Sequence, residues 1–366
     1  MQEVQPLETS LENPVLTPMS ENDYEQVVFC QDEKTGLRAI IAIHNTVLGP
    51  ALGGTRMWPY KSELEALQDV LRLSRGMTYK ASISGLNLGG GKAVILGNSR
   101  SQKNEGLLRR FGRFVDSLGG KYITAEDVGM STKDIEYMAM ETDHVTGKPE
   151  YLGGSGDPSP LTAYGVYMGM KASAKRAWGS DSLEGKAVMV QGVGHVGQYL
   201  VDYLAKEGAV ISIADIYADR LKLVSGKHKV EVVDPDSVFD EAVDIYAPCA
   251  LGATLNDGNL AKLSCRVISG AANNQLADEH VHAKLVKEMG MFYAPDFVIN
   301  AGGLMNCYAE LHGYDREAAM KQAQGIYDTT LNIYEYAEQK VMTTHEAASK
   351  MAEERIQTVA GINQSW

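Results

Sequence analysis

The sequence lacks the features of a membrane, secreted or nucleic-acid-binding protein. None of its 366 residues belongs to a run approaching the roughly 20 apolar residues that cross a bilayer. The N-terminal MQEVQPLETSLENPVL has no basic segment followed by an apolar core, so it predicts a polar tail rather than a secretory signal. Lysine and arginine form no block and the net charge is −13, which argues against nucleic acid as a partner.

Cysteine is also scarce, and its spacing excludes two common kinds of site. The four cysteines contain no CxxC pair, so they predict reduced thiols in a cytoplasmic protein rather than a disulfide framework; they are Cys30, Cys249, Cys265 and Cys307. The run His345-Glu346-Ala347-Ala348-Ser349 begins like a zinc-protease motif but has serine where the second histidine belongs. We therefore expect no metal site.

Two architectures follow one another along the chain, which predicts an α/β protein of two domains. The first 150 residues mix short strands with amphipathic helices, as at 39–43 and at 64–77, where Ser62 and Glu65 predict a capping box. A Gly/Pro-rich segment at 153–160 predicts a hinge or a cleft between domains. From about residue 185, apolar strands alternate with helices, which favours a parallel sheet covered on both faces. We place the boundary between 1–150 and 151–334, with the C-terminal helix 335–366 packing back on the first domain.

A glycine-rich turn in the second domain has the pattern of a dinucleotide-binding loop. An apolar strand at 187–191 leads directly into a GxGxxG sequence, and a helical stripe follows it. In this pattern the glycines permit the tight turn, the approach of a pyrophosphate and the packing of helix on strand. The alternative is a tight strand–turn–helix without a ligand, but the context on both sides favours the cofactor. The loop consists of Gly192, Val193, Gly194, His195, Val196, Gly197 and Gln198.

Asp215 ends the next strand, and it bears on the choice of cofactor. A carboxylate there can accept hydrogen bonds from ribose hydroxyls and would repel a 2′-phosphate, so NAD is favoured over NADP. Arg220 lies five residues further on and weakens that preference.

A lysine–glycine–aspartate constellation in the first domain suggests catalysis. Lys80 ends an amphipathic helix, Lys92 follows three glycines, and Asp127 follows a short strand. Three glycines remove side chains beside Lys92, which would let a substrate come close. Apolar neighbours on both sides predict that Lys92 is desolvated, and a lysine tuned toward neutrality can act as a general base. From spacing alone, a lysine after a glycine turn is more often a solvated loop residue.

Seven long motifs, in order, resemble the glutamate/leucine/phenylalanine/valine dehydrogenases. The likeness covers nearly all of the chain after about residue 20 and is strongest to the leucine-specific members. The motifs are Gly49–Met57, Met77–Lys80, Leu86–Lys92, Ala125–Gly129, Asp157–Gly165, Ala271–Gln275 and Val298–Gly303.

The resemblance implies an N-terminal α/β domain for substrate binding and oligomerisation, a Rossmann-type NAD-binding domain, and an active site in the cleft between them. Lys80 would hold the substrate carboxylate, with Gly53 nearby; Lys92 would be the base that activates water; and Asp127 would shuttle protons. The remaining implied contacts to cofactor or substrate are Thr162, Asn273, Asn274 and Asn300. The family also implies a homo-oligomer, either an octamer or a dimer.

The resemblance further implies an uncharged pocket for the substrate side chain, formed by Leu52, Met77, Ala125, Leu304 and Cys307. Such a pocket disfavours glutamate and accepts leucine, valine and isoleucine, because one methylene is worth only about 1–3 kcal/mol. Leu304 and Cys307 stand where leucine-specific members carry valines, and His195 and Gly197 also depart from the usual leucine-type loop. The implied reaction is reversible deamination of a branched-chain amino acid to its 2-keto acid and ammonium. The alternatives are a phenylalanine- or valine-preferring dehydrogenase, and a nucleotide-binding regulatory protein without activity.

Overall fold

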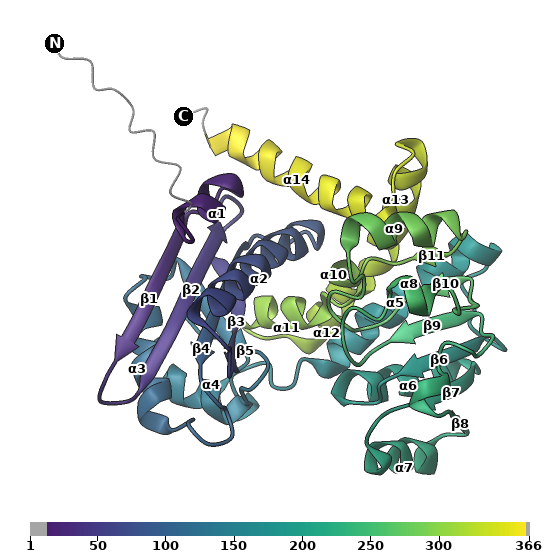
Figure 1. Ribbon diagram of the computed structural model, residues 1–366, viewed down its shortest axis with the longest axis horizontal. Coiled ribbons are helices and arrows are strands. Elements are labelled where there is room, and N and C mark those ends of the chain that lie inside the picture. The colour runs from purple at the N-terminus through teal and green to yellow at the C-terminus, as the bar shows by residue number, and fades with distance from the viewer. Residues whose placement is uncertain (1–12, 364–366) are drawn as a thin grey trace.

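The computed structural model describes residues 13–363, which form two β-sheets with helices around each (Figure 1). Most of the predicted polar tail, residues 1–12, lies outside the described residues, as do residues 364–366. Within the described part, α1 (Leu16–Glu21) begins at the last residue of the predicted tail. None of the helices described is long and apolar enough to cross a membrane.

The first sheet has five strands in the order β1-β2-β4-β3-β5. Strands β1 and β2 form an antiparallel hairpin, β2 pairs antiparallel with β4, and β3 lies parallel to both β4 and β5. The bounds are β1 (Gln26–Asp32), β2 (Leu37–Asn45), β3 (Ala51–Trp58), β4 (Gly89–Leu96) and β5 (Tyr122–Glu126).

Alternation of side chains along β2 explains why helices cover both faces of this sheet. Ile40 and Ala42 pack in a cluster with α2 (Glu63–Ile83), whereas Ile41 and its alternate neighbours pack in another with α3 (Glu105–Asp116). Successive residues of a strand point to opposite faces, so a strand buried on both sides is apolar throughout. Helix α4 (Thr132–Ala139) packs beside α3.

Helix α2 begins close to the predicted capping box, with one difference. The Ser62 side chain accepts a hydrogen bond from the backbone N–H of Glu65, as expected. The Glu65 carboxylate, however, accepts the N–H of Lys61 rather than that of Ser62. Both bonds still satisfy free N–H groups at the helix start, so the helix that carries Met77 and Lys80 is well anchored there.

The second sheet is fully parallel, with six strands in the order β11-β10-β9-β6-β7-β8, which confirms the predicted Rossmann-type fold. The strands are β6 (Ala187–Gln191), β7 (Val210–Ala214), β8 (Glu231–Val232), β9 (Ile245–Pro248), β10 (Val267–Ile268) and β11 (Phe292–Tyr293). The associated helices are α6 (His195–Glu207), α7 (Ala218–Lys227), α8 (Asp257–Leu260) and α9 (Glu279–Glu288).

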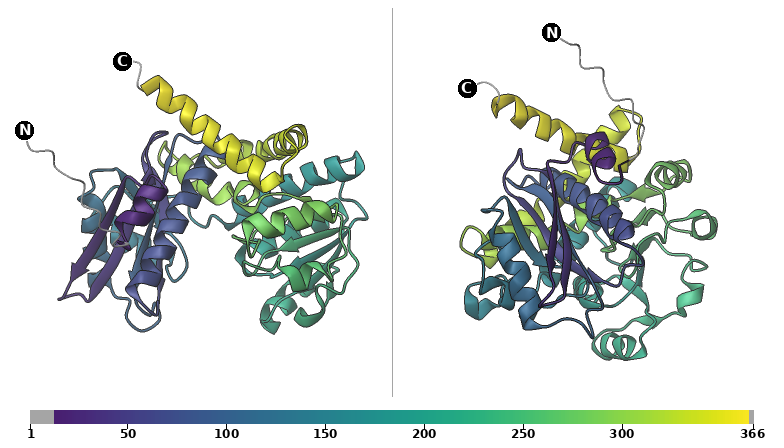
Figure 2. Two further views of the ribbon diagram at one scale, coloured as in Figure 1. Left: turned by 45° about the horizontal axis from the view of Figure 1, so that its top comes forward. Right: turned by 60° about the vertical axis from the view of Figure 1, so that its left-hand side comes forward.

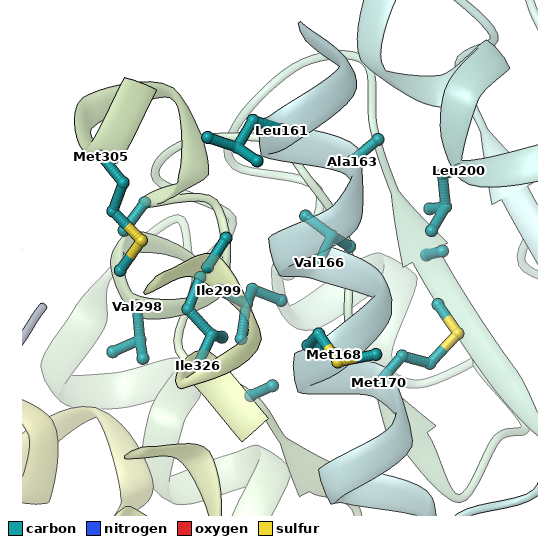
Figure 3. Close-up of a cluster of buried hydrophobic side chains, with 14 of the residues drawn as sticks. Leu161, Ala163, Val166, Met168, Met170, Leu200, Val298, Ile299, Met305 and Ile326 are labelled. Atoms are coloured by element: carbon teal, nitrogen blue, oxygen red, sulfur yellow. The ribbon is translucent and has the colours of Figure 1, made fainter. Parts of the chain in front are cut away.

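Helix α5 (Ser159–Trp178) is the central element that links this sheet to the C-terminal helices. Its Ala163, Val166 and Met170 are fully buried, and Figure 3 shows them among side chains from α6 and from the segment after β11. That segment contains α10 (Asp296–Ile299), α11 (Gly302–Glu310), α12 (Arg316–Gln324) and α13 (Ile326–Gln339).

The last helix, α14 (Thr344–Asn363), returns to the first sheet's side of the molecule, drawn in yellow in Figures 1 and 2. The Ser82 hydroxyl at the end of α2 donates to the Ala352 carbonyl at 2.8 Å. Arg355 in turn donates to the carbonyls of Ser82 and Leu86. These bonds tie the C-terminal helix to α2, the helix that carries Lys80.

Candidate active site

Lys92 is the fourth residue of strand β4 and its side chain is almost fully buried, with 5% of its surface exposed. Spacing alone suggested a glycine turn before Lys92, but Gly89–Gly91 are the first three residues of strand β4. A Cβ on Gly90 would overlap Thr78 and lie 2.6 Å from the Ser74 carbonyl, and a Cβ on Gly91 would lie 2.7 Å from the Tyr122 ring. The glycines let helix α2 and Tyr122 pack against the strand, so protein fills that space.

Asp127 follows strand β5 and receives donors on both carboxylate oxygens. Oδ2 forms an ion pair with Lys92, and Oδ1 accepts the Arg56 Nε at 3.0 Å and the Val128 N–H at 2.7 Å. Burial alone would raise the pKa of this carboxyl, but Lys92 and then Arg56 outweigh it and lower the pKa to about 2. Asp127 is therefore ionised at neutral pH.

Lys80, on α2, joins the first sheet's side of the site to the second. Its ammonium donates to Asn300 Oδ1 at 2.7 Å, and the Asn300 amide donates to Asn273 Oδ1 at 2.8 Å and to the Ala271 carbonyl at 3.2 Å. Burial lowers the pKa of Lys80 to about 8, and the neighbouring Lys92 contributes to that lowering. Sequence reasoning placed Lys92 in apolar surroundings; in the structure Lys92 has Asp127 as a carboxylate partner, whereas the partner of Lys80 is the neutral Asn300 amide.

Two charged residues that the sequence reasoning did not select lie beside these groups. Arg56 contacts Asp127 directly, and the buried Asp296 is the carboxylate that most strongly opposes the fall in the pKa of Lys80. Arg56 stands inside the recognised motif Gly49–Met57, whereas Asp296 lies two residues before the motif Val298–Gly303. For each of them, the available signal in the sequence was a single charged residue in a strand or short helix whose other residues are uncharged.

The glycine-rich loop makes the tight turn between β6 and α6 that its sequence predicts. Gly192 has φ of +99° and Ala250 lies 2.7 Å from where its Cβ would be, so only glycine fits the turn. A Cβ on Gly194 would meet only the Arg220 guanidinium at 3.7 Å, and no side chain caps the start of α6. The first N–H groups of that helix, at its positive end, are thus open to an anion.

The other loop residues divide between structural and exposed positions. Val193 and Gly197 are buried, whereas His195 is exposed at the helix start and Val196 is half-buried. Gln198 donates from its amide to the Val193 carbonyl at 3.1 Å.

Asp215 lies at the end of β7, as predicted, but its oxygens already have partners. Oδ2 accepts the Val193 N–H at 2.9 Å and Oδ1 accepts the Tyr217 N–H at 2.9 Å. Arg220 lies 3.7 Å from the same carboxylate. A carboxylate has about four acceptor positions, so the two backbone donors do not saturate it; 5% of the Asp215 side chain is exposed.

The other predicted contact residues lie in the loop after β10, at the start of α5 and in β3. Asn273 and Asn274 lie exposed in the loop after β10, and Asn274 has a positive φ of 52°. The Thr162 hydroxyl donates to the Pro158 carbonyl at 2.9 Å in the first turn of α5. The Gly53 carbonyl accepts the Tyr122 hydroxyl at 2.6 Å, so it is already hydrogen-bonded.

The predicted pocket residues come from both halves of the chain and belong to one apolar cluster. Met77 is partly buried against the cluster and the others are buried within it; they are Leu52, Ala125, Leu304 and Cys307. Burial raises the pKa of the Cys307 thiol to about 11, so that side chain is neutral. These side chains are apolar and uncharged, and Met77 lies one helical turn before Lys80 on α2.

Comparison with known proteins places this site in a known family. The model of the Glu/Leu/Phe/Val dehydrogenase dimerisation domain matches residues 24–144, and that of the Glutamate/Leucine/Phenylalanine/Valine dehydrogenases matches 153–219 and 214–360. The leucine dehydrogenase of Thermoactinomyces intermedius is 54% identical over 93% of this chain and 92% of that protein. The valine dehydrogenase of Streptomyces coelicolor is 48% identical over 91% and 92%.

A solved structure agrees with these matches. That of L-tryptophan dehydrogenase from Nostoc punctiforme is similar with a TM-score of 0.83 at 43% sequence identity, covering 94% of this chain and 99% of that chain. The buried lysines and aspartate, the glycine-rich loop and the family matches together lead to one conclusion. The chain belongs to the glutamate/leucine/phenylalanine/valine dehydrogenase family of dinucleotide-dependent amino-acid dehydrogenases.

Proposed function

We propose that the protein catalyses the reversible, NAD-dependent oxidative deamination of L-leucine and related branched-chain amino acids to 2-keto acids and ammonium. The observation that carries the proposal is the group formed by the buried Lys92 and the half-buried Lys80 and Asp127, joined through Asn300 to the domain that bears the glycine-rich loop. The identity of 54% to a leucine dehydrogenase supports the choice of substrate.

Each charged group has a distinct task in this proposal. Lys80 binds the substrate α-carboxylate, and Asn300 orients the ammonium through its hydrogen bond. Lys92 is the base that takes a proton from the attacking water, and Asp127, ionised in the folded protein, accepts and returns protons at its Oδ2. NAD, when bound, supplies the acceptor for the hydride that leaves the substrate Cα.

The cofactor assignment rests on the loop and on Asp215. Gly192–Gln198 would hold the pyrophosphate at the start of α6, and Asp215 would accept the ribose hydroxyls with its remaining lone pairs. The negative charge of Asp215 disfavours a 2′-phosphate. Thr162, Asn273 and Asn274 remain proposed contacts to cofactor or substrate.

The substrate side chain would enter the apolar group around Ala125 and Leu304, with Leu52, Met77 and Cys307 nearby. A glutamate carboxylate would be buried there without a partner, at a cost of several kcal/mol. Aliphatic chains differ by one methylene, so valine and isoleucine should also react.

The arrangement of the molecule is part of the same proposal. We assign residues 1–150 with the C-terminal helix to the substrate domain, Gly53 included, and 151–334 to the cofactor domain, with catalysis in the cleft. A homo-oligomer, dimer or octamer, is supported by the match to a dimerisation-domain model. The four free thiols favour a reducing compartment such as the cytoplasm.

A substrate panel tests the proposal. NADH formation is measured with leucine, valine, isoleucine, phenylalanine and glutamate. The proposal expects the first three to react, phenylalanine to react poorly and glutamate not at all. A preference for valine or phenylalanine would select one of the other family members, and no turnover with any amino acid would favour a regulatory role.

A further inference from the structure

Arg56 lies between two carboxylates at the end of strand β3, and only 23% of its side chain is exposed. Its Nε donates to Asp127 Oδ1 at 3.0 Å, and its NH1 donates to Asp69 Oδ2 at 3.0 Å. A guanidinium has five N–H donors in a fixed planar arrangement, so it can hold two acceptors at set angles. Arg56 therefore connects the catalytic carboxylate to helix α2, on which Asp69 lies.

The second carboxylate is itself fixed by further bonds. The Tyr60 hydroxyl donates to Asp69 Oδ2 at 2.7 Å, and Arg72, which is 61% exposed, lies 3.2 Å from Asp69 Oδ1. Lys92, Asp127, Arg56 and Asp69 thus form a continuous chain of alternating charge. A partly buried chain of this kind holds its geometry only when every member is present.

The two oxygens of Asp127 have different surroundings as a result. Oδ1 accepts both the Arg56 Nε and the Val128 N–H, whereas Oδ2 has Lys92 as its partner. Two donors on Oδ1 leave it poorly placed to accept a third. Proton exchange with Lys92 or with a substrate group is thereby confined to Oδ2.

We infer that Arg56 is a positioning residue for Asp127, which holds Oδ1 through the Asp69 anchor so that Oδ2 alone exchanges protons in the cleft. The inference rests on the proposed function, because the proton-transfer role of Asp127 belongs to that proposal. The inference requires a guanidinium at this position, because only its planar set of N–H donors can contact both carboxylates.

The test compares Arg56→Met and Arg56→Lys with wild type, using whichever amino acid the wild-type enzyme turns over fastest. For Arg56→Met we expect kcat to fall by about 10²-fold, the scale of losing a positioned acid–base group. We also expect the pKa of the Asp127 carboxyl, followed by carbon-13 NMR, to rise from about 2 by about one to three pH units, because an arginine beside an aspartate stabilises the carboxylate by that much. Arg56→Lys keeps the charge, so the pKa of Asp127 should rise less in this variant while its kcat stays low.

Three controls distinguish a positioning role of Arg56 from a general loss of structure or of cofactor binding. Arg72→Met removes a different, exposed arginine from Asp69 and should keep wild-type turnover and pH profile. NADH binding, measured by fluorescence, should change less than about twofold in Arg56→Met, because the arginine is remote from the glycine-rich loop. If Arg56→Met does not fold, Asp69→Asn is tested instead, and we expect the same changes with a smaller magnitude.

The outcomes are distinct. A folded Arg56→Met enzyme, or failing that a folded Asp69→Asn enzyme, with wild-type kcat and an unchanged pKa of Asp127 would overturn the inference. It would leave the proposed function intact. Absence of wild-type turnover with every amino acid would instead overturn the proposed function.

Discussion

Lys80 is a buried ammonium whose hydrogen-bond partner, Asn300, is neutral. Its pKa of about 8 lies below the ordinary value of 10.5, so the folded protein binds this proton less tightly than the unfolded chain. Above pH 10.5 the Lys80 side chain is deprotonated in both the folded and the unfolded state, so its burial costs no stability. The free energy of unfolding therefore falls as the pH is lowered from 10.5 through 8. The residue that would bind the substrate carboxylate thus destabilises the fold at neutral pH.

Lys80→Met should accordingly be more stable than wild type at pH 7, by on the order of 1 kcal/mol after allowance for the lost hydrogen bond. The difference should shrink as pH rises toward 10.5, the ordinary pKa of lysine. Urea unfolding of both proteins across this pH range measures it. A stability difference that does not vary with pH would show that Lys80 is not destabilised by burial.

The neighbouring charges of Asp215 and Arg220 allow a test of cofactor choice. Asp215→Ala should weaken NAD binding and improve NADP relative to NAD, because an acceptor and a repelling charge are both removed while Arg220 becomes free for a 2′-phosphate. Adding Arg220→Ala should cancel the gain with NADP. The measurement is kcat/KM for both cofactors in the two single variants and the double variant. If Asp215→Ala improves kcat/KM with NADP equally with and without Arg220, then Arg220 does not contact the 2′-phosphate.

Replacing Ala125 by glycine removes one methyl group from the proposed pocket for the substrate side chain. Ala125→Gly should improve phenylalanine relative to leucine by roughly five- to tenfold in kcat/KM, since a methyl group is worth about 1 kcal/mol. The ratio is measured for both proteins at saturating NAD. If the ratio stays constant or moves toward leucine, Ala125 does not touch the substrate, and the pocket must be redrawn around Leu304 and Cys307.

At the scale of elements, the close packing of α2 on β4 positions Lys80 and Lys92 relative to each other. Gly90 is the contact point, because a side chain there would overlap Thr78. Gly90→Ala should force α2 away from the strand, lower stability by about 1–3 kcal/mol and reduce turnover.

Gly76→Ala is the matched control in the same helix. No atom lies within 4 Å of where its Cβ would be. Alanine is the better helix former, so this variant should gain about 0.5–1 kcal/mol and keep its activity. Thermal unfolding and turnover are compared for both variants; equal effects of the two substitutions would contradict the role given to close packing at Gly90.

The same elements show how far the sequence could go. The glycine-rich loop was predicted correctly as a strand–turn–helix because its strand, turn and helix are local in sequence. The glycines before Lys92 were misassigned to a turn, since a close approach between α2 and β4 leaves no local pattern. Arg56 was not selected, because its contact with Asp127 depends on the register between β3 and β5.

At the scale of the whole molecule, the contacts that make the site are long-range. Lys80 and Asn300 are 220 residues apart, and α14 returns from the C-terminus to bond with α2. Family resemblance pointed to both residues, but their hydrogen bond and the shifted pKa of Lys80 required the fold. These contacts bring the lysines and aspartate to the side of the molecule where the glycine-rich loop lies.

The central claim is that this arrangement deaminates branched-chain amino acids with Lys92 as the base. The most direct measurement is NADH formation from leucine and NAD by the wild type and by Lys92→Ala, with NADH binding measured for both. We predict turnover by the wild type, a loss of about 10²–10⁴-fold in Lys92→Ala and nearly unchanged NADH binding. A Lys92→Ala enzyme that keeps more than about a tenth of the wild-type kcat, far above the loss expected for a missing base, would contradict the account.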